Sequence, residues 1–235
     1  MFVTNDIEKV IPKQPGTVRF VCMSDTHGKT QFKFPIPDGD VFIHAGDLTR
    51  AGNYGEFKAT IEWIKSLPHK IKIVTAGNHD HYLDERLTNS TNVKQELLAL
   101  FEEAEITYLE HESYQLPDEF GGYRLFVSPY SPLHLGGAFM PIKGLRGRWD
   151  DVPDNIDIIV THTPPRGTLD LTRRGQNVGC EFLEKRIYEI NPKVSIFGHI
   201  HEAGGYEYHD NILFINACTS NYRYQPNQTP IVFDL

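Results

Sequence analysis

Cysteine is scarce in this sequence, and long apolar runs are missing. The three cysteines, Cys22, Cys180 and Cys218, are odd in number and far apart, which is poor material for a disulfide framework and favours a reducing compartment. No stretch approaches the roughly 18 apolar residues of a membrane-spanning helix. The first sixteen residues have no apolar run of signal-peptide length. The sequence therefore predicts a cytoplasmic protein without a membrane partner.

An excess of positive charge is also missing. The 235 residues carry a formal net charge of −8, with 23 Lys and Arg against 31 Asp and Glu. This balance disfavours broad electrostatic binding to nucleic-acid polymers or to anionic membranes. It does not exclude a small anionic substrate, because bound metal ions can reverse the charge inside a pocket. The sequence leaves the oligomeric state open.

The composition is typical of one globular domain. Hydrophobic residues make up 40% of the chain and charged residues 23%, which is enough apolar material for one sizeable core. Residues 1–16, closed by Pro15-Gly16, are predicted to form an N-terminal arm. Residues 17–235 are predicted to form a single domain.

Apolar patterns predict strands that alternate with helices early in the chain, and hairpins in the middle and at the end. Strands are predicted near residues 18–23, 41–45, 71–75, 107–109, 113–116, 123–127, 156–161, 193–197, 206–208, 212–215 and 231–233. Helices are predicted around residues 57–67, 93–103 and 178–190. This mixture predicts an α/β fold, a four-layer αββα sandwich of two mixed sheets flanked by helices.

Side chains of the metal-binding type follow five of the predicted strands. They are Asp25 and His27, Asp47, Asn78 and His79, His162, and His199 and His201. Ligand sites of open α/β sheets lie beyond the carboxyl ends of the strands, so these side chains can converge there. A mixed nitrogen and oxygen set suits Mn, Fe, Co, Ni or Zn better than Ca or Mg. Two carboxylates, one amide oxygen and four or five imidazoles make at least seven ligands, more than the four of a structural zinc site. We therefore expect two divalent ions.

The charge of such a site bears on its substrate. Two ions about 3.5–4 Å apart can hold a hydroxide between them and clamp the oxygens of a phosphoryl group. Two divalent ions, two aspartates and one hydroxide leave a net charge of +1. This charge favours a phosphodiester monoanion, although a phosphomonoester remains open.

Two loops, residues 132–150 and 164–177, are predicted to frame the mouth of the site. Their arginines could clamp phosphate oxygens in a bidentate manner, but solvated loop arginines are at least as common. We therefore leave them outside the predicted site: Arg146, Arg148, Arg166, Arg173 and Arg174. Among the remaining histidines, His44 is expected near the site. His69, His111 and His209 stand in polar context and are expected at the surface.

The motifs SDTHG, HAGDLT, AGNHD, VTHTPP and FGHIHEAGG resemble the signature of the calcineurin-like metallophosphoesterase superfamily. From Val18 onward the chain looks like that superfamily, and its C-terminal half is similar to the small metallophosphoesterase domain-containing branch. The resemblance implies ligands for one metal (Asp25, His27, His201), ligands for the other (Asn78, His162, His199) and a bridge (Asp47). Mn²⁺ is the expected metal, with Fe, Zn, Co or Ni as alternatives.

The resemblance also implies two residues that act without binding metal. His79 would stabilise the transition state, with protonation of the leaving oxygen as a further role. Asp80 would orient His79 from behind, as carboxylates commonly do for catalytic imidazoles.

Departures from related families narrow the hypothesis. GDLTRAG lacks the acidic and arginine residues of the protein-phosphatase motif GDxxDRG, and Thr49 stands where purple acid phosphatases have a tyrosine ligand. We therefore hypothesise a phosphodiesterase that cuts small phosphodiesters such as cyclic nucleotides by attack of a metal-bridging hydroxide. A phosphomonoesterase or protein phosphatase remains an alternative, as does a scaffold that keeps the fold without turnover.

Overall fold

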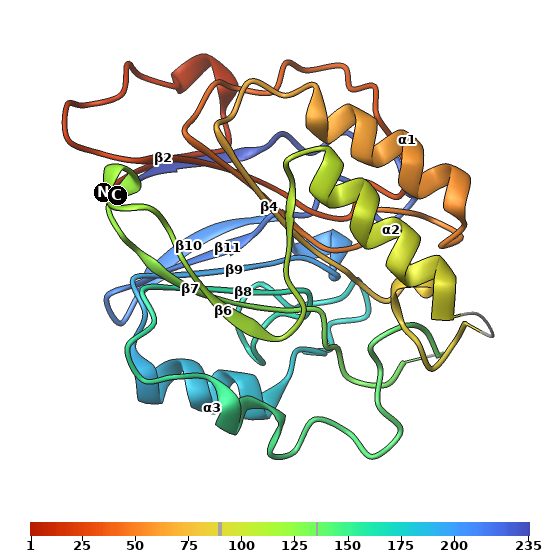
Figure 1. Ribbon diagram of the computed structural model, residues 1–235. Helices are drawn as coiled ribbons and strands as arrows, with labels where there is room; N and C mark the ends of the chain where they lie inside the picture. Colours follow the sequence, from red (N-terminus) through yellow and green to blue (C-terminus); the bar gives the residue numbers. More distant parts are fainter. Residues whose placement is uncertain (89–90, 135) are drawn as a thin grey trace.

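The computed structural model, described over residues 1–88, 91–134 and 136–235, has its strands in two six-stranded sheets (Figure 1). The first sheet has the spatial order β1 (Phe2–Thr4), β12 (Ile231–Asp234), β2 (Arg19–Met23), β3 (Val41–Ala45), β4 (Ile71–Thr75) and β5 (Thr107–Tyr108). The second sheet has the order β10 (Gly205–His209), β11 (Ile212–Asn216), β9 (Val194–Phe197), β8 (Ile158–Thr161), β7 (Arg124–Ser128) and β6 (Glu112–Gln115).

Both sheets are parallel in the middle and antiparallel at an edge. In the first sheet β2, β3, β4 and β5 run parallel, and β12 and β1 join them in antiparallel pairs. In the second sheet β7, β8, β9 and β11 run parallel, with β6 and β10 antiparallel at the two edges. The central parallel strands bring their carboxyl ends to one side of the molecule.

In the described ranges, three α-helices cover the outer faces of the sheets. α1 (Tyr54–Lys65) and α2 (Thr91–Glu103) pack on the first sheet, and α3 (Glu181–Ile190) packs on the second (Figure 1). α1 begins where the Asn53 side chain accepts a hydrogen bond from the Glu56 amide at 3.1 Å, an N-cap. The predicted four-layer αββα sandwich of two mixed sheets is confirmed.

Burial on both faces explains why the inner strands are apolar at almost every position. Every residue of β2 and β3 is buried, because one face packs on the facing sheet and the other on helices. Phe20 and Ile43 of the first sheet share the core between the sheets with Val127 and Ile196 of the second.

The predicted N-terminal arm contains a strand that the sequence analysis did not anticipate. β1 pairs with β12, with Val3 opposite Phe233. The two ends of the chain lie side by side in Figure 1. The domain boundary at residue 16 stays a prediction.

Several side chains predicted near the surface or a loop mouth lie in the interior instead. His69 is buried, and its Nε2 lies 3.1 Å from the Pro37 carbonyl oxygen, so its surface prediction is wrong. His111 is half-buried. In the predicted loop 132–150, where Leu135 lies outside the described residues, a 3-10 helix (Arg148–Asp151) buries Trp149 against Cys180.

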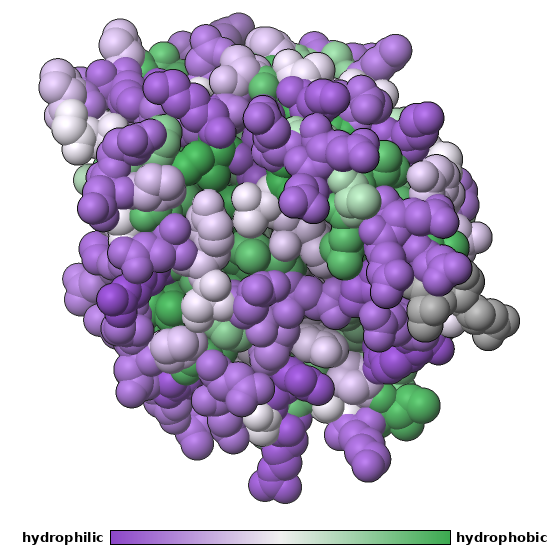
Figure 2. All heavy atoms as spheres, in the orientation of Figure 1, coloured by the Kyte–Doolittle hydropathy of each residue, from purple (hydrophilic) through white to green (hydrophobic). Residues whose placement is uncertain are grey.

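One face of the molecule is drawn by hydropathy in Figure 2. The face in Figure 2 is mostly hydrophilic, and its apolar residues form small separate patches. None of the helices in the described ranges has the length and apolar content needed to cross a membrane.

Candidate metal centre

The predicted site residues lie at the carboxyl ends of five parallel strands, where the two sheets meet. The first sheet contributes the residues that follow β2, β3 and β4, and the second sheet those that follow β8 and β9. They are Asp25, His27, Asp47, Asn78, His79, Asp80, His162, His199 and His201.

Four of the predicted metal ligands have a left-handed backbone. The φ angles are 54° at Asp25, 48° at His27, 54° at Asp47 and 71° at His199. This conformation is uncommon for residues other than glycine and costs about 1 kcal/mol or more at each position. Hydrogen bonds hold it: the Asp25 amide donates to Gly46 O at 2.9 Å, and the His27 amide to Asp47 O at 3.0 Å.

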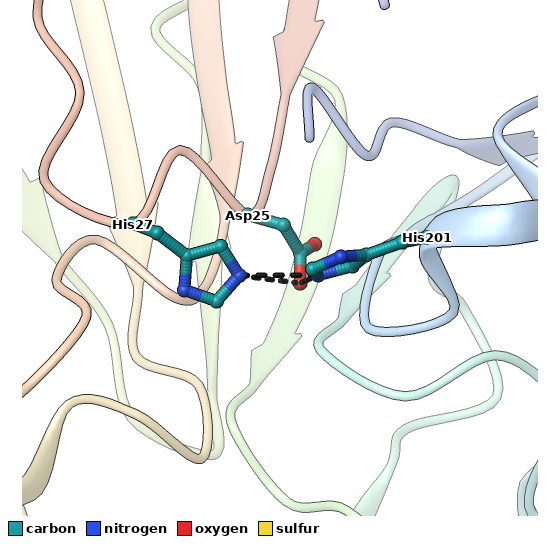
Figure 3. A group of neighbouring side chains, drawn as sticks. All are labelled: Asp25, His27 and His201. Carbon is teal, nitrogen blue, oxygen red and sulfur yellow. Dashed lines mark hydrogen bonds and ion pairs between the residues drawn. The ribbon is translucent and has the colours of Figure 1, made fainter. Parts of the chain in front are cut away.

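Asp25, His27 and His201 form a group whose ligand atoms converge (Figure 3). His201 Nε2 lies 3.2 Å from Asp25 Oδ1 and 3.1 Å from His27 Nε2. His27 Nε2 lies 4.0 Å from the same carboxylate oxygen. All three side chains are at least nine-tenths buried.

Asp47, Asn78 and His162 converge in the same way beside this group. His162 Nε2 lies 3.0 Å from Asn78 Oδ1 and 3.4 Å from Asp47 Oδ1. The other Asp47 oxygen, Oδ2, lies 3.8 Å from His27 Nε2. The His199 ring lies 5.0 Å from the His162 ring. Asp47 therefore faces histidines of both groups.

The hydrogen bonds of two imidazoles fix where their lone pairs point. The Nδ1–H of His162 donates to Ala45 O at 2.9 Å, and that of His201 to Asn221 O at 3.0 Å. In the neutral rings Nε2 is then an acceptor in both residues. The acceptor of His162 faces Asp47 and Asn78 oxygens, which are acceptors too. A cation resolves such a contact, as in metal sites whose histidines donate their second nitrogen.

The pKa shifts of the two buried carboxylates also indicate a cation site. Burial and the neighbouring Asp25 carboxylate raise the pKa of Asp47 well above its ordinary value. Burial also acts to raise the pKa of Asp25, but its hydrogen bond with His201 and the neighbouring histidines outweigh this and hold it well below its ordinary value. Two buried carboxylates this close do not both ionise without a compensating charge. Divalent cations supply that charge.

Two of the imidazoles are ready to act as ligands at neutral pH. Burial lowers the pKa of His27 and of His199 to about 3, so both rings are neutral and keep a lone pair for a metal. This donor set fits two divalent ions of the type predicted from the sequence.

Three groups hold the second oxygen of Asp25, and one of them is a cysteine. Oδ2 accepts hydrogen bonds from Ser24 Oγ at 2.6 Å, the His199 amide at 2.9 Å and Cys218 Sγ at 3.2 Å. Burial and the Asp25 carboxylate raise the pKa of the Cys218 thiol well above its ordinary value, so it stays protonated and donates. The sequence does not predict this contact, because Cys218 and Asp25 are 193 residues apart.

Glycines adjoin the ligands where a side chain would displace them. A Cβ at Gly77 would lie 2.5 Å from the Asp47 amide nitrogen and 2.6 Å from His162 Cε1. A Cβ at Gly198 would lie 2.7 Å from Ser24 Cβ and would overlap the Asp25 carboxylate. Only glycine leaves room for the two ligand groups to approach.

His79 stands beside the centre and is half-buried. Its amide donates to Asp47 Oδ1 at 2.8 Å, and its ring lies 4.7 Å from the His27 ring. Its Nδ1–H donates to Arg50 O at 2.7 Å. A backbone carbonyl therefore orients this imidazole.

The predicted role of Asp80 behind the His79 ring is wrong. The buried Asp80 carboxylate accepts four hydrogen bonds from the Leu48, Thr49 and Gly77 amides and from Thr49 Oγ1, at 2.7–3.1 Å. Asp80 thus ties the loop after β3 to the loop after β4 and acts on His79 only through the backbone.

His44 lies near the site, as expected. This buried residue of β3 has its Nε2 at 2.9 Å from Thr26 Oγ1. Since Thr26 stands between Asp25 and His27, His44 supports the loop that carries these two residues.

Tyr224 is a neighbour of the centre that the sequence analysis missed. Its ring lies 4.8 Å from the His27 ring, 5.2 Å from His201 and 6.1 Å from His79. The Arg50 guanidinium lies 5.0 Å from the centre of the same ring. No local pattern marks Tyr224, because its partners are far away in the sequence.

The loop arginines set aside in the sequence analysis do not reach the ligands. Within the described ranges, no hydrogen bond or ion pair joins Arg146, Arg148, Arg166, Arg173 or Arg174 to a predicted ligand. Arg148 lies 4.3 Å from the centre of the Tyr130 ring, and Arg173 lies 4.0 Å from that of Tyr222.

Comparisons with known proteins agree with this centre. A family model described as calcineurin-like phosphoesterase matches residues 18–203. The chain is 37% identical to Metallophosphoesterase domain-containing protein 1 of Homo sapiens over 242 residues, 95% of this chain and 73% of that protein. It is 36% identical to a UPF0046 protein of Caenorhabditis elegans, over 93% of this chain and 81% of that protein.

A solved structure shares the fold. The phosphopantetheinyl hydrolase PptH of Mycobacterium tuberculosis superposes with a TM-score of 0.60 at 15% identity, over 87% of this chain and 90% of that chain. The resemblance inferred from the motifs is confirmed: this chain belongs to the calcineurin-like metallophosphoesterase family of metal-dependent phosphoric ester hydrolases.

Proposed function

We propose that the chain is a two-metal-dependent phosphodiesterase that hydrolyses small phosphodiesters such as cyclic nucleotides. The observation that carries the proposal is the position of Asp47. One of its oxygens lies 3.8 Å from His27 and the other 3.4 Å from His162, which belong to the two ligand groups. This position suits a carboxylate shared by two ions.

Each ligand group would hold one ion. Asp25, His27 and His201 would hold the first, Asn78, His162 and His199 the second, and Asp47 both. Mn²⁺ is the proposed metal, with Fe, Zn, Co or Ni as alternatives, because the donors mix nitrogen and oxygen. When bound, the ions supply Lewis acidity, which neutralises charge on the phosphoryl oxygens and makes hydroxide available at neutral pH.

His79 would act on the leaving group. Its Nδ1–H is held by Arg50 O, so an imidazolium at this position would present Nε2–H to the leaving oxygen. The half-buried ring beside Asp47 is accessible to a substrate. Asp80 would serve as a positioning residue, because it fixes the backbone on which His79 and Asp47 stand.

The diester preference rests on charge. Two divalent ions, two carboxylates and a hydroxide sum to +1, which balances a singly charged diester better than a doubly charged monoester. The proposed location is the cytoplasm, a reducing compartment in keeping with three free, buried cysteines.

Turnover of two aryl esters by the Mn²⁺-reconstituted protein tests the proposal. We expect bis(p-nitrophenyl) phosphate to be cleaved with a higher kcat/KM than p-nitrophenyl phosphate, and 2′,3′- or 3′,5′-cyclic nucleotides to be cleaved as well. A preference for the monoester would favour a phosphomonoesterase. Absence of turnover with every metal would favour a scaffold without activity.

A variant of His79 separates catalysis from metal binding. His79→Ala should lower kcat by about 10²–10⁴-fold, the range of general acid–base catalysis, while the bound metal stays at the wild-type content. His209→Ala is the matched control, because His209 lies in the β10–β11 hairpin. Loss of metal from His79→Ala would instead identify His79 as a metal ligand. The geometry allows this, because ligand atoms of His27, Asp47 and His79 lie within 4.8 Å of one another.

A further inference from the structure

Three exposed arginines around the centre stack on tyrosines, and within the part of the chain that the structure describes none of the three forms an ion pair with a carboxylate. Arg50 lies 5.0 Å from the Tyr224 ring centre, and Arg173 and Arg223 lie 4.0 and 5.2 Å from that of Tyr222. Ion pairs of arginine with carboxylates in the described ranges involve other residues: Arg19, Arg86 and Arg186. We call these five residues, Arg50, Arg173, Tyr222, Arg223 and Tyr224, the arginine–tyrosine rim.

The rim is joined directly to the metal centre. Asn221 O accepts hydrogen bonds from His201 Nδ1 at 3.0 Å and from the Tyr224 amide at 2.8 Å. The Asn221 side chain accepts the Arg223 amide at 2.8 Å. Arg173 is joined through its amide, which lies 3.4 Å from Glu202, the residue after His201. The rim and the ligand His201 therefore share one scaffold.

The backbone of Tyr224 is strained. Its φ is 57°, and an aromatic residue in this region is a rare outlier that persists where the surroundings impose it. The strain places the ring against His27 and His201 with the Arg50 guanidinium on it. Strain of this kind clusters at ligand-binding positions.

The distances indicate which part of a substrate the rim would meet. The Arg50 guanidinium lies 5.0 Å from a ring whose centre is itself 4.8 Å from His27. This position, one aromatic ring beyond the ligands, suits a group attached to the scissile phosphate. Unpaired guanidinium groups bind phosphate through paired N–H donors, and they stand out in a chain of net charge −8.

We propose that the arginine–tyrosine rim binds a second phosphate group of the substrate, so that the chain prefers nucleotides that carry a further phosphomonoester. The proposal deepens the phosphodiesterase function and rests on it for the identity of the scissile group. The binding of a second phosphate can be measured without turnover.

Calorimetric titration of the Mn²⁺-loaded protein tests the binding. The two probes are thymidine 5′-monophosphate and thymidine 3′,5′-bisphosphate, which differ only in the 3′-phosphate. We expect the bisphosphate to bind at least about tenfold more tightly, because one charge-assisted hydrogen-bonded contact increases the affinity by about this factor. Equal affinities would overturn the proposal.

Single variants assign the preference to the rim. Arg50→Gln and Arg173→Gln should each reduce the affinity ratio several-fold, and Arg50→Gln keeps the carbonyl that holds His79. Arg124→Gln is the matched control, since Arg124 is exposed at the amino end of β7. A ratio that stays at the control value in both rim variants would refute the rim as the second phosphate site.

Turnover separates this proposal from the function on which it rests. Thymidine 5′-(p-nitrophenyl phosphate) is a plain diester, and failure to cleave it with any metal would refute the phosphodiesterase function while the two binding constants still decide the rim. Cleavage without a bisphosphate preference would refute the rim alone.

Discussion

Carboxylates at the two ends of the parallel strands are neutralised in different ways. At the amino ends, Asp234 and Arg19 form a buried pair with two contacts of 2.8 Å. Asp40 pairs with Lys13 at 2.5 Å and accepts the Arg19 amide, and Asp157 pairs with Lys193. The chain itself supplies the counter-charge of these three carboxylates.

At the carboxyl ends, histidines take the place of lysine and arginine. Asp25 and Asp47 face His27, His162 and His201, and an imidazole that binds a metal does so in its neutral form, which does not cancel a carboxylate charge. At the amino ends the carboxylates are therefore neutralised by side chains of the same chain. At the carboxyl ends their neutralisation depends on added cations.

The largest effect is expected from the carboxylate between the two ligand groups. Asp47→Asn should lower kcat/KM by more than about 100-fold, because loss of an outer-shell partner alone costs about 10–100-fold. Metal content, measured by plasma mass spectrometry, should fall as well. Full metal content with full activity would remove Asp47 from the site.

A substitution at the amino ends of the strands should change the stability of the protein but not its metal content. Asp234→Asn leaves the buried Arg19 without its partner, which should lower the free energy of unfolding by about 3 kcal/mol. Denaturant unfolding measures the loss, and the metal content should stay at the wild-type value. A loss of metal from this variant would contradict the division between the two ends.

Two glycine-to-alanine substitutions test how tightly the site at the carboxyl ends is packed. Gly198→Ala places a Cβ against Asp25 and Ser24, which should cost about 2 kcal/mol by overpacking and reduce metal content. Gly55→Ala is the control, because Gly55 lies in α1 and its Cβ would meet only Asn53 Oδ1 at 3.4 Å. We expect this variant to be more stable by about 0.5 kcal/mol. Equal effects of the two substitutions would argue against a crowded centre.

The smallest effect concerns a buried histidine outside the centre. Burial lowers the pKa of His69 to about 4, below its unfolded value of about 6.5. The unfolded chain therefore binds a proton first as pH falls, so the stability is present above about pH 6.5 and is lost towards pH 4. Between about pH 7.5 and 5.5 the wild type should lose about 1 kcal/mol more than His69→Gln in chemical unfolding. Parallel pH profiles would mean that the pKa of His69 is the same in the folded and in the unfolded chain.

Much of the fold was predictable because its signals are local. The apolar runs at residues 41–45 and 71–75 match β3 and β4 to the residue, and the ligand motifs directly follow these runs. β1 escaped prediction because three residues make no pattern of their own and form a strand only against β12.

The parts of the centre that could not be predicted depend on contacts between distant segments. Tyr224 lies almost 200 residues after His27, its ring partner, and nothing local to either residue indicates the contact. The family resemblance implied a contact between the Asp80 carboxylate and the His79 ring. The carboxylate instead accepts backbone amides from two loops, Leu48 among them. His69 stands in polar sequence but meets the Pro37 carbonyl inside the protein.

The hydrogen bonds of Asp80 have a consequence for motion around the centre. They join the loop of Asp47 to the loop of Asn78 and His79, so the two loops form one cooperative opening unit. An excursion that moves Asp47 would therefore also move Asn78 and His79. With the roles proposed above, release of both ions and loss of the leaving-group contact would then belong to a single event.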